Sequence, residues 1–68
     1  MNTSPKLGYA SVVIRDRSGD LLLNLTNEGS YYNLRDADGV VEDVLTPENA
    51  YRTFHHWASE PGARVQVV

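Results

Sequence analysis

One stretch of the sequence decides the fold: residues 46–58, which read TPENAYRTFHHWA. Thr46 suits the cap of a helix, Pro47 is tolerated at the first helical position, and Glu48 complements the helix dipole. Apolar side chains then recur every three or four residues, which is typical of a helix with one apolar face. They are Ala50, Tyr51, Phe54, Trp57 and Ala58. We predict a helix near residues 47–59, ended by Pro61 and Gly62, with Phe54 and Trp57 in the core.

The residues before and after this helix alternate between apolar and polar side chains, which is typical of half-buried strands. Turn-forming residues separate the alternating runs, at 16–19, 27–30 and 36–39. The first run and the second form a hairpin, in which Asp16 opens the turn and Gly19 takes a positive φ. We predict strands near 9–15, 20–26, 30–35, 40–45 and 64–68, and a frayed start over residues 1–7. No internal repeat is apparent.

The order β-β-β-β-α-β predicts the fold class. We expect an α+β two-layer sandwich over residues 1–68, a single domain in which one helix covers one face of an antiparallel four- or five-stranded sheet. The helical connection is long enough to lay the last strand parallel to a neighbour. One helix leaves the other face of the sheet open. Strand alternation makes that face half apolar, with Tyr9, Val13, Leu22 and Tyr31 on it.

Size and composition exclude several classes of function. The chain has 68 residues, no cysteine and 41% apolar side chains. A domain of this length buries only about 60% of its unfolded surface, so we expect one thin core and no self-contained enzyme pocket. Without cysteine there is no disulfide, and a reducing cytoplasmic location is expected. The apolar runs are too short to span a bilayer or to form a signal peptide, so we expect no membrane contact.

The net charge of −3 is unevenly distributed. Residues 1–35 hold four basic and three acidic side chains, whereas residues 36–68 hold two basic and six acidic ones. Most of this acid falls between residues 36 and 48, a stretch without Lys or Arg. The segment should project a negative potential that repels nucleic acid, so direct nucleic-acid binding is not expected.

No pattern of catalytic or metal-binding residues is found. His55 and His56 are adjacent, so on a helix they point in different directions and cannot hold one metal ion together. The acids around Gly39 suggest a calcium loop, but its register places Leu34 and Leu45 at ligand positions, and a polar hairpin turn is the better interpretation. Nucleophile elbows and phosphate-binding glycine loops are absent from the sequence. We therefore predict a protein that is not an enzyme and has no metal or other cofactor.

Part of the chain resembles the opening half of a Nudix hydrolase, where a hairpin leads into a glycine-started loop and a helix. The resemblance covers residues 10–23, 31–42 and 46–48. It implies a nucleotide or small-ligand binder, with Tyr32, Trp57 and Arg35 as stacking and anion contacts. The relative would be catalytically inactive, because none of the family's metal-binding carboxylates is present. We align the glycine that begins the family's sequence motif with Gly39. The motif's other defining positions then hold Leu45, Thr53, Phe54, Trp57, Ala58 and Glu60.

Our first hypothesis is a non-enzymatic protein-binding module, a small acidic accessory protein or inhibitor that covers a basic functional surface of a larger partner. If the partner handles nucleic acid, the acidic surface would compete for the same Lys and Arg side chains. In size and charge the chain resembles inhibitors from phages and mobile elements, including anti-CRISPR proteins. The alternatives are the inactive Nudix-like binder and a homodimeric regulatory module that pairs through the open sheet face or an edge strand. The predicted contact residues are Asp36, Asp38, Glu42, Asp43, Glu48, Tyr9 and Tyr31.

Overall fold

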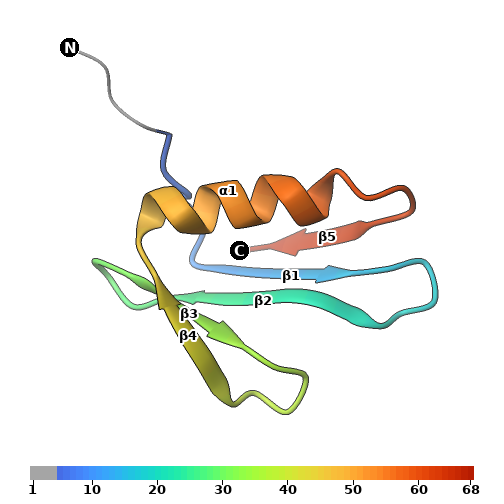
Figure 1. Cartoon of the computed structure of the whole chain (residues 1–68), viewed down its shortest axis with the longest axis horizontal. Coiled ribbons are helices and arrows are strands. Elements are labelled where there is room, and N and C mark those ends of the chain that lie inside the picture. Colours follow the sequence, from blue (N-terminus) through green and yellow to red (C-terminus); the bar gives the residue numbers. More distant parts are fainter. Residues whose placement is uncertain (1–4) are drawn as a thin grey trace.

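The computed structural model describes residues 5–68 and confirms the α+β fold, with its elements in the predicted order (Figure 1). Residues 1–4, where a frayed start is predicted, lie outside the described residues. The single helix packs on one face of a five-stranded sheet. The elements are β1 (Ser11–Arg15), β2 (Leu21–Asn27), β3 (Tyr32–Arg35), β4 (Val41–Leu45), α1 (Pro47–Ala58) and β5 (Arg64–Val67).

The strands lie in the order β4-β3-β2-β1-β5, and every pair of neighbours is antiparallel. The expectation that the last strand could lie parallel to its neighbour is therefore wrong. β4 and β5 do run in the same direction, as a helical crossover requires, but three strands separate them. The helix thus carries the chain from one edge of the sheet to the other.

Helix α1 begins and ends through local capping. The Thr46 hydroxyl accepts a hydrogen bond from the Asn49 N–H (3.1 Å), and Pro47 occupies the first turn. At the other end, the Ser59 N–H and hydroxyl both donate to the His55 carbonyl oxygen. These contacts satisfy backbone groups that a helix end otherwise leaves without partners.

The core lies between the sheet and the helix, where strand alternation directs the apolar side chains. Val12 pairs with Leu25, and Ile14 pairs with Leu23, so these four side chains form a buried block. Ala50 is the only buried residue of α1. Phe54 and Trp57, predicted in the core, are only half-buried and pack against its margin. The small Ala50 side chain lets the first half of the helix approach the sheet closely, whereas the bulkier aromatic side chains stay at the side.

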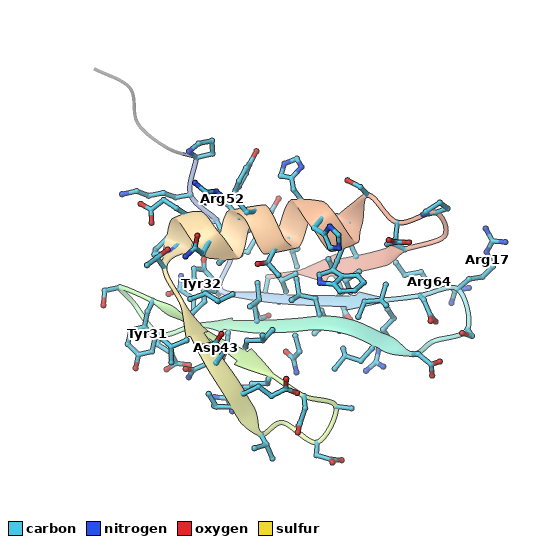
Figure 2. All side chains as sticks on the ribbon, viewed as in Figure 1. Arg17, Tyr31, Tyr32, Asp43, Arg52 and Arg64 are labelled. Atoms are coloured by element: carbon cyan, nitrogen blue, oxygen red, sulfur yellow. The ribbon has the colours of Figure 1, made fainter. Side chains whose placement is uncertain are left out.

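Tyr32 is the largest fully buried side chain and fixes the chain that leads into β1. Its hydroxyl lies 2.7 Å from the Tyr9 carbonyl oxygen and 3.1 Å from that of Leu7, and it accepts a hydrogen bond from the Asn27 amide. In Figure 2 Tyr32 lies beneath the first turn of α1. A buried hydroxyl needs hydrogen-bond partners, and the Tyr32 hydroxyl bonds to the segment before β1, which is distant in sequence.

The predicted frayed start over residues 1–7 is wrong at Leu7, which is held in place by burial and by a hydrogen bond. Its side chain is only 6% exposed, and its N–H donates to the Pro47 carbonyl oxygen (3.1 Å). The neighbouring Lys6 ammonium lies 3.8 Å from the Glu48 carboxylate. The segment is ordered because Leu7 fills the space where the helix begins and Tyr32 holds its carbonyl group.

We expect Tyr32→Phe to lower the free energy of unfolding by about 1–2 kcal/mol, because two backbone carbonyl groups lose their buried donor. Urea denaturation followed by circular dichroism measures this loss. Tyr31→Phe is the matched control: its side chain is exposed, and we expect a change within about 0.5 kcal/mol. Equal stability of both variants would show that the Tyr32 hydroxyl does not anchor the segment.

Stability should also fall at alkaline pH because of Tyr32. Burial raises the pKa of its phenol above the ordinary value of 10.0, although the hydrogen bond from Asn27 opposes the rise. Since the folded-state pKa is the higher one, the contribution to stability is complete below pH 10 and is lost as the pH rises through the folded-state pKa. Urea midpoints measured between about pH 8 and pH 11 should fall less in Tyr32→Phe than in the parent. Parallel loss in both proteins would contradict this assignment.

Candidate functional site

A groove of 310 Å³ lies on the helix side of the sheet, between α1 and the hairpin formed by β3 and β4. Trp57 and Thr53, one helical turn apart, line it from α1. Apolar side chains of β2 and β3 provide most of the facing wall, and acidic residues of the second hairpin stand beside them. The facing residues are Leu21, Leu22, Leu23, Leu34, Arg35, Asp36, Ala37 and Glu42.

Two hairpins with the same local sequence build this wall. The runs Ile14-Arg15-Asp16 and Leu34-Arg35-Asp36 lie twenty positions apart, and each is followed by a glycine three residues after the aspartate. In both turns the glycine N–H donates to the aspartate carbonyl oxygen, and Gly19 and Gly39 take positive φ angles of 93° and 84°. The two turns therefore share the short motif Arg-Asp-x-x-Gly.

The two aspartates hold these turns together. Oδ1 of Asp36 accepts hydrogen bonds from the Asp38 and Val40 N–H groups, both at 2.9 Å. Asp16 makes the equivalent bonds, and the Ser18 hydroxyl, followed by the Asp20 N–H, lowers the pKa of its carboxyl below the ordinary 3.8. Asp36 therefore has a structural role in addition to its place in the groove.

Each hairpin also contains a β-bulge at the same place. Ile14 pairs with Leu23 and Arg15 with Leu21, which leaves Leu22 as the extra residue of β2. In the second hairpin Leu34 pairs with Asp43 and Arg35 with Val41, which leaves Glu42 as the extra residue of β4. Bulges redirect side chains. Leu22, predicted on the open face, accordingly packs against the core, and Glu42 lines the groove beside it.

The predicted acidic contact residues are only partly brought together. Asp36 and Glu42 line the groove, and Asp43 lies next to Glu42, opposite Leu34 on the helix-facing side of the sheet. Asp38 is exposed at the tip of the turn and does not line the groove. Glu48 belongs to the first turn of α1 and pairs with Lys6. Two of the five acids therefore line the candidate site, and Asp43 lies beside them.

The two predicted tyrosine anchors do not line the groove. The Tyr9 ring, predicted on the open face, instead packs against Phe54, with ring centroids 5.9 Å apart. Tyr31 is 40% exposed and precedes β3, at the end of the sheet opposite Arg17 and Arg64 (Figure 2). Both rings are exposed enough to contact a partner, but on different parts of the surface from the groove.

The open sheet face is more polar than predicted over β1, β2 and β3, although Val44 of β4, which pairs with Asn33, is exposed beside them. Val13 lies between Asn24 and Gln66, and Thr26 lies between Ser11 and Asn33. With Leu22 in the core and Tyr9 against the helix, Val13 is the one residue of the predicted apolar set within the strands of this face. Polar side chains can face water without a partner, so this face supports an interface less than the sequence suggested.

The groove residues that sequence reasoning missed include Leu22 and Leu34. Each belongs to a strand whose alternation is visible in the sequence, but the bulge that directs Leu22 inward is not. The shared turn motif aligns Leu22 with Glu42, but the motif by itself does not predict a bulge. Trp57 was predicted as a core residue, and under the Nudix-like alternative as a stacking contact; it is half-buried, with the His56 ring 4.9 Å away.

Two of the contacts expected from the Nudix resemblance are already engaged. Tyr32 is only 1% exposed, so its ring cannot stack on a ligand. The Arg35 guanidinium donates to the Thr26 hydroxyl (3.1 Å) and the Gly39 carbonyl oxygen (2.8 Å), and lies 3.9 Å from the Glu28 carboxylate. Only Trp57 remains exposed to a ligand.

Comparison with known proteins gives no assignment: no protein-family model, curated protein or solved structure matches this chain. Within residues 5–68, no three His, Asp or Glu side chains are grouped so that they could bind a metal ion. No helix in the same range is long and apolar enough to cross a membrane.

Proposed function

We propose that this protein is a non-enzymatic binding module that recognises a basic surface of a larger protein. The observation that carries the proposal is the groove, where the apolar side chains of Trp57, Leu22 and Leu34 lie beside the carboxylates of Asp36 and Glu42. Aromatic and aliphatic side chains provide buried contact area, and the acids select a positively charged partner.

The module acts as an accessory protein or inhibitor by covering the surface that it binds. A partner that handles nucleic acid offers a suitable surface, because its Lys and Arg side chains already bind phosphates and would be masked by the acids. The absence of cysteine supports a reducing, cytoplasmic location as part of the same proposal.

The acids at the groove differ in how safely they can be substituted. Reversing Asp36 would break the turn that its carboxylate holds, so the informative substitutions are Glu42→Lys and Asp43→Lys together. A matched control is Asp20→Lys with Glu60→Lys, since both side chains are exposed and neither lines the groove. The two variants carry the same change in charge.

We expect the tagged parent to capture a partner from its native host that the Glu42/Asp43 variant captures at least about tenfold less, while the Asp20/Glu60 control retains it. Mass spectrometry quantifies capture, and isothermal titration with the purified partner then gives the affinity of each variant. Thermal melting establishes that both variants are folded. Equal capture by the parent and the Glu42/Asp43 variant would contradict the proposed function.

Self-association through β5 is a second candidate, because the two edges of the sheet differ. β4 carries a bulge and two acids, features that discourage pairing with another strand. No bulge interrupts β5 within its pairing to β1, and its apolar side chains Val65 and Val67 are 44% and 38% exposed. An edge of this kind can add a strand from a second copy.

Light scattering at micromolar concentration tests this candidate. A β5-mediated dimer has twice the monomer mass of 7.6 kDa, and Val67→Lys should return it to the monomer. Val40→Lys is the control, because Val40 is 59% exposed and lies beside the opposite edge. A parent protein that stays monomeric over the accessible concentrations removes the candidate.

A further inference from the structure

The groove has the chemical character of a site for one long cationic side chain. At 310 Å³ it lies at the small end of ligand-binding pockets, so it suits one side chain better than a nucleotide. Its apolar walls match an aliphatic stem, and its acids match a charged end. A purely apolar or purely anionic occupant would leave one of these two surfaces unsatisfied.

The two acids that line the groove form no ion pair within residues 5–68. Within residues 5–68, the Glu42 carboxylate forms no ion pair or hydrogen bond, and Asp36 uses only Oδ1 for its turn. Arg35 also lines the groove, but its guanidinium is held at Thr26, Gly39 and Glu28. A cation from a partner would therefore meet carboxylate oxygens that are not already paired.

The two equivalent bulges carry different kinds of side chain, which bears on the role of Glu42. Leu22 occupies the equivalent bulge in the first hairpin, where it packs against the core. A leucine at position 42 would extend the same apolar wall and would favour folding through burial. The chain instead carries an exposed carboxylate there, and this carboxylate lines the groove.

Arginine fits the groove better than lysine. Its guanidinium is planar, is less strongly hydrated than an ammonium group, stacks on aromatic rings and donates to carboxylates in a fork. Trp57 offers the best aromatic surface for such a cation, and Glu42 offers the acceptor. Resting on the proposed function above, we infer that the groove binds one arginine side chain of the partner, with its stem along Leu22, Leu34 and Trp57 and its guanidinium at Glu42 and the outer oxygen of Asp36.

The protein contains one tryptophan, so the Trp57 indole N–H signal reports on the groove in a ¹⁵N-labelled sample. The probes are three peptides that differ only in the central residue: acetyl-Gly-Arg-Gly-amide and its lysine and citrulline analogues. We expect the arginine peptide to shift this signal saturably, the lysine peptide to bind several-fold more weakly, and the neutral citrulline peptide to bind at least about tenfold more weakly. Equal binding of arginine and citrulline would overturn the inference.

Three variants identify the site. Glu42→Gln should weaken binding of the arginine peptide about fivefold or more, and Glu42→Leu should abolish it while the melting temperature stays equal or rises. Asp38→Asn is the matched control, since it removes one charge from the same hairpin outside the groove and should leave binding within about twofold. Equal weakening by Glu42→Gln and Asp38→Asn would indicate a general charge effect and overturn the inference.

The two proposals fail in different ways. If the arginine peptide leaves the Trp57 signal unchanged but partner capture still depends on Glu42 and Asp43, the arginine inference is wrong and the proposed function stands. If capture is independent of these two acids, the proposed function is wrong whatever the peptide titration shows.

Discussion

The width of one helix relative to five strands is the constraint on which the rest of this structure depends. Neighbouring strands lie about 4.8 Å apart, so the outer strands of β4-β3-β2-β1-β5 are separated by about 19 Å, whereas a helix with its side chains is only about 10–12 Å wide. α1 is therefore too narrow to cover all five strands and leaves a margin on each side, and Figure 1 shows the β3–β4 hairpin extending away from the helix. One margin is the groove beside β3 and β4, and the other exposes the valines of β5.

The protein compensates for this narrow cover with the segment that precedes β1. Leu7 enters the core where the helix starts, and the Tyr32 hydroxyl holds the carbonyl groups of Leu7 and Tyr9. The segment thus acts as a second, smaller layer beside α1. Tyr9 continues this layer by packing on Phe54, which explains why its ring is not on the open face.

Local features of the sequence predicted the elements well, because each depends on residues close together in the chain. Thr46, Pro47 and the apolar spacing after them define α1. Each hairpin turn is defined by a glycine preceded by an aspartate or, between β2 and β3, by an asparagine. Leu7 could not be predicted in the same way, since its partners Pro47 and Tyr32 are distant in sequence. The half-burial of Trp57 also depends on how far the sheet extends beyond the helix, which periodicity does not contain.

The candidate site was predictable in its charge but not in its shape. The excess of acid between residues 36 and 48 is plain in the sequence, yet only the structure separates Glu42 and Asp43 from Asp38 at the turn tip and Glu48 on the helix. The shape could not be predicted because of the bulges: a shift of one residue in a strand reverses the face of the sheet on which a side chain lies. The two bulges hold a leucine, Leu22, in one hairpin and an acid, Glu42, in the other.

The central claim is that the margin beside β3 and β4 is a binding site for a cationic side chain. Its most direct test is a crystal structure of the protein with acetyl-arginine amide at saturating concentration, which locates the guanidinium. The account predicts the guanidinium within hydrogen-bond distance of Glu42 and the aliphatic stem along Trp57. An empty groove, with the ligand bound beside other exposed acids such as Asp20 or Glu60, would contradict it.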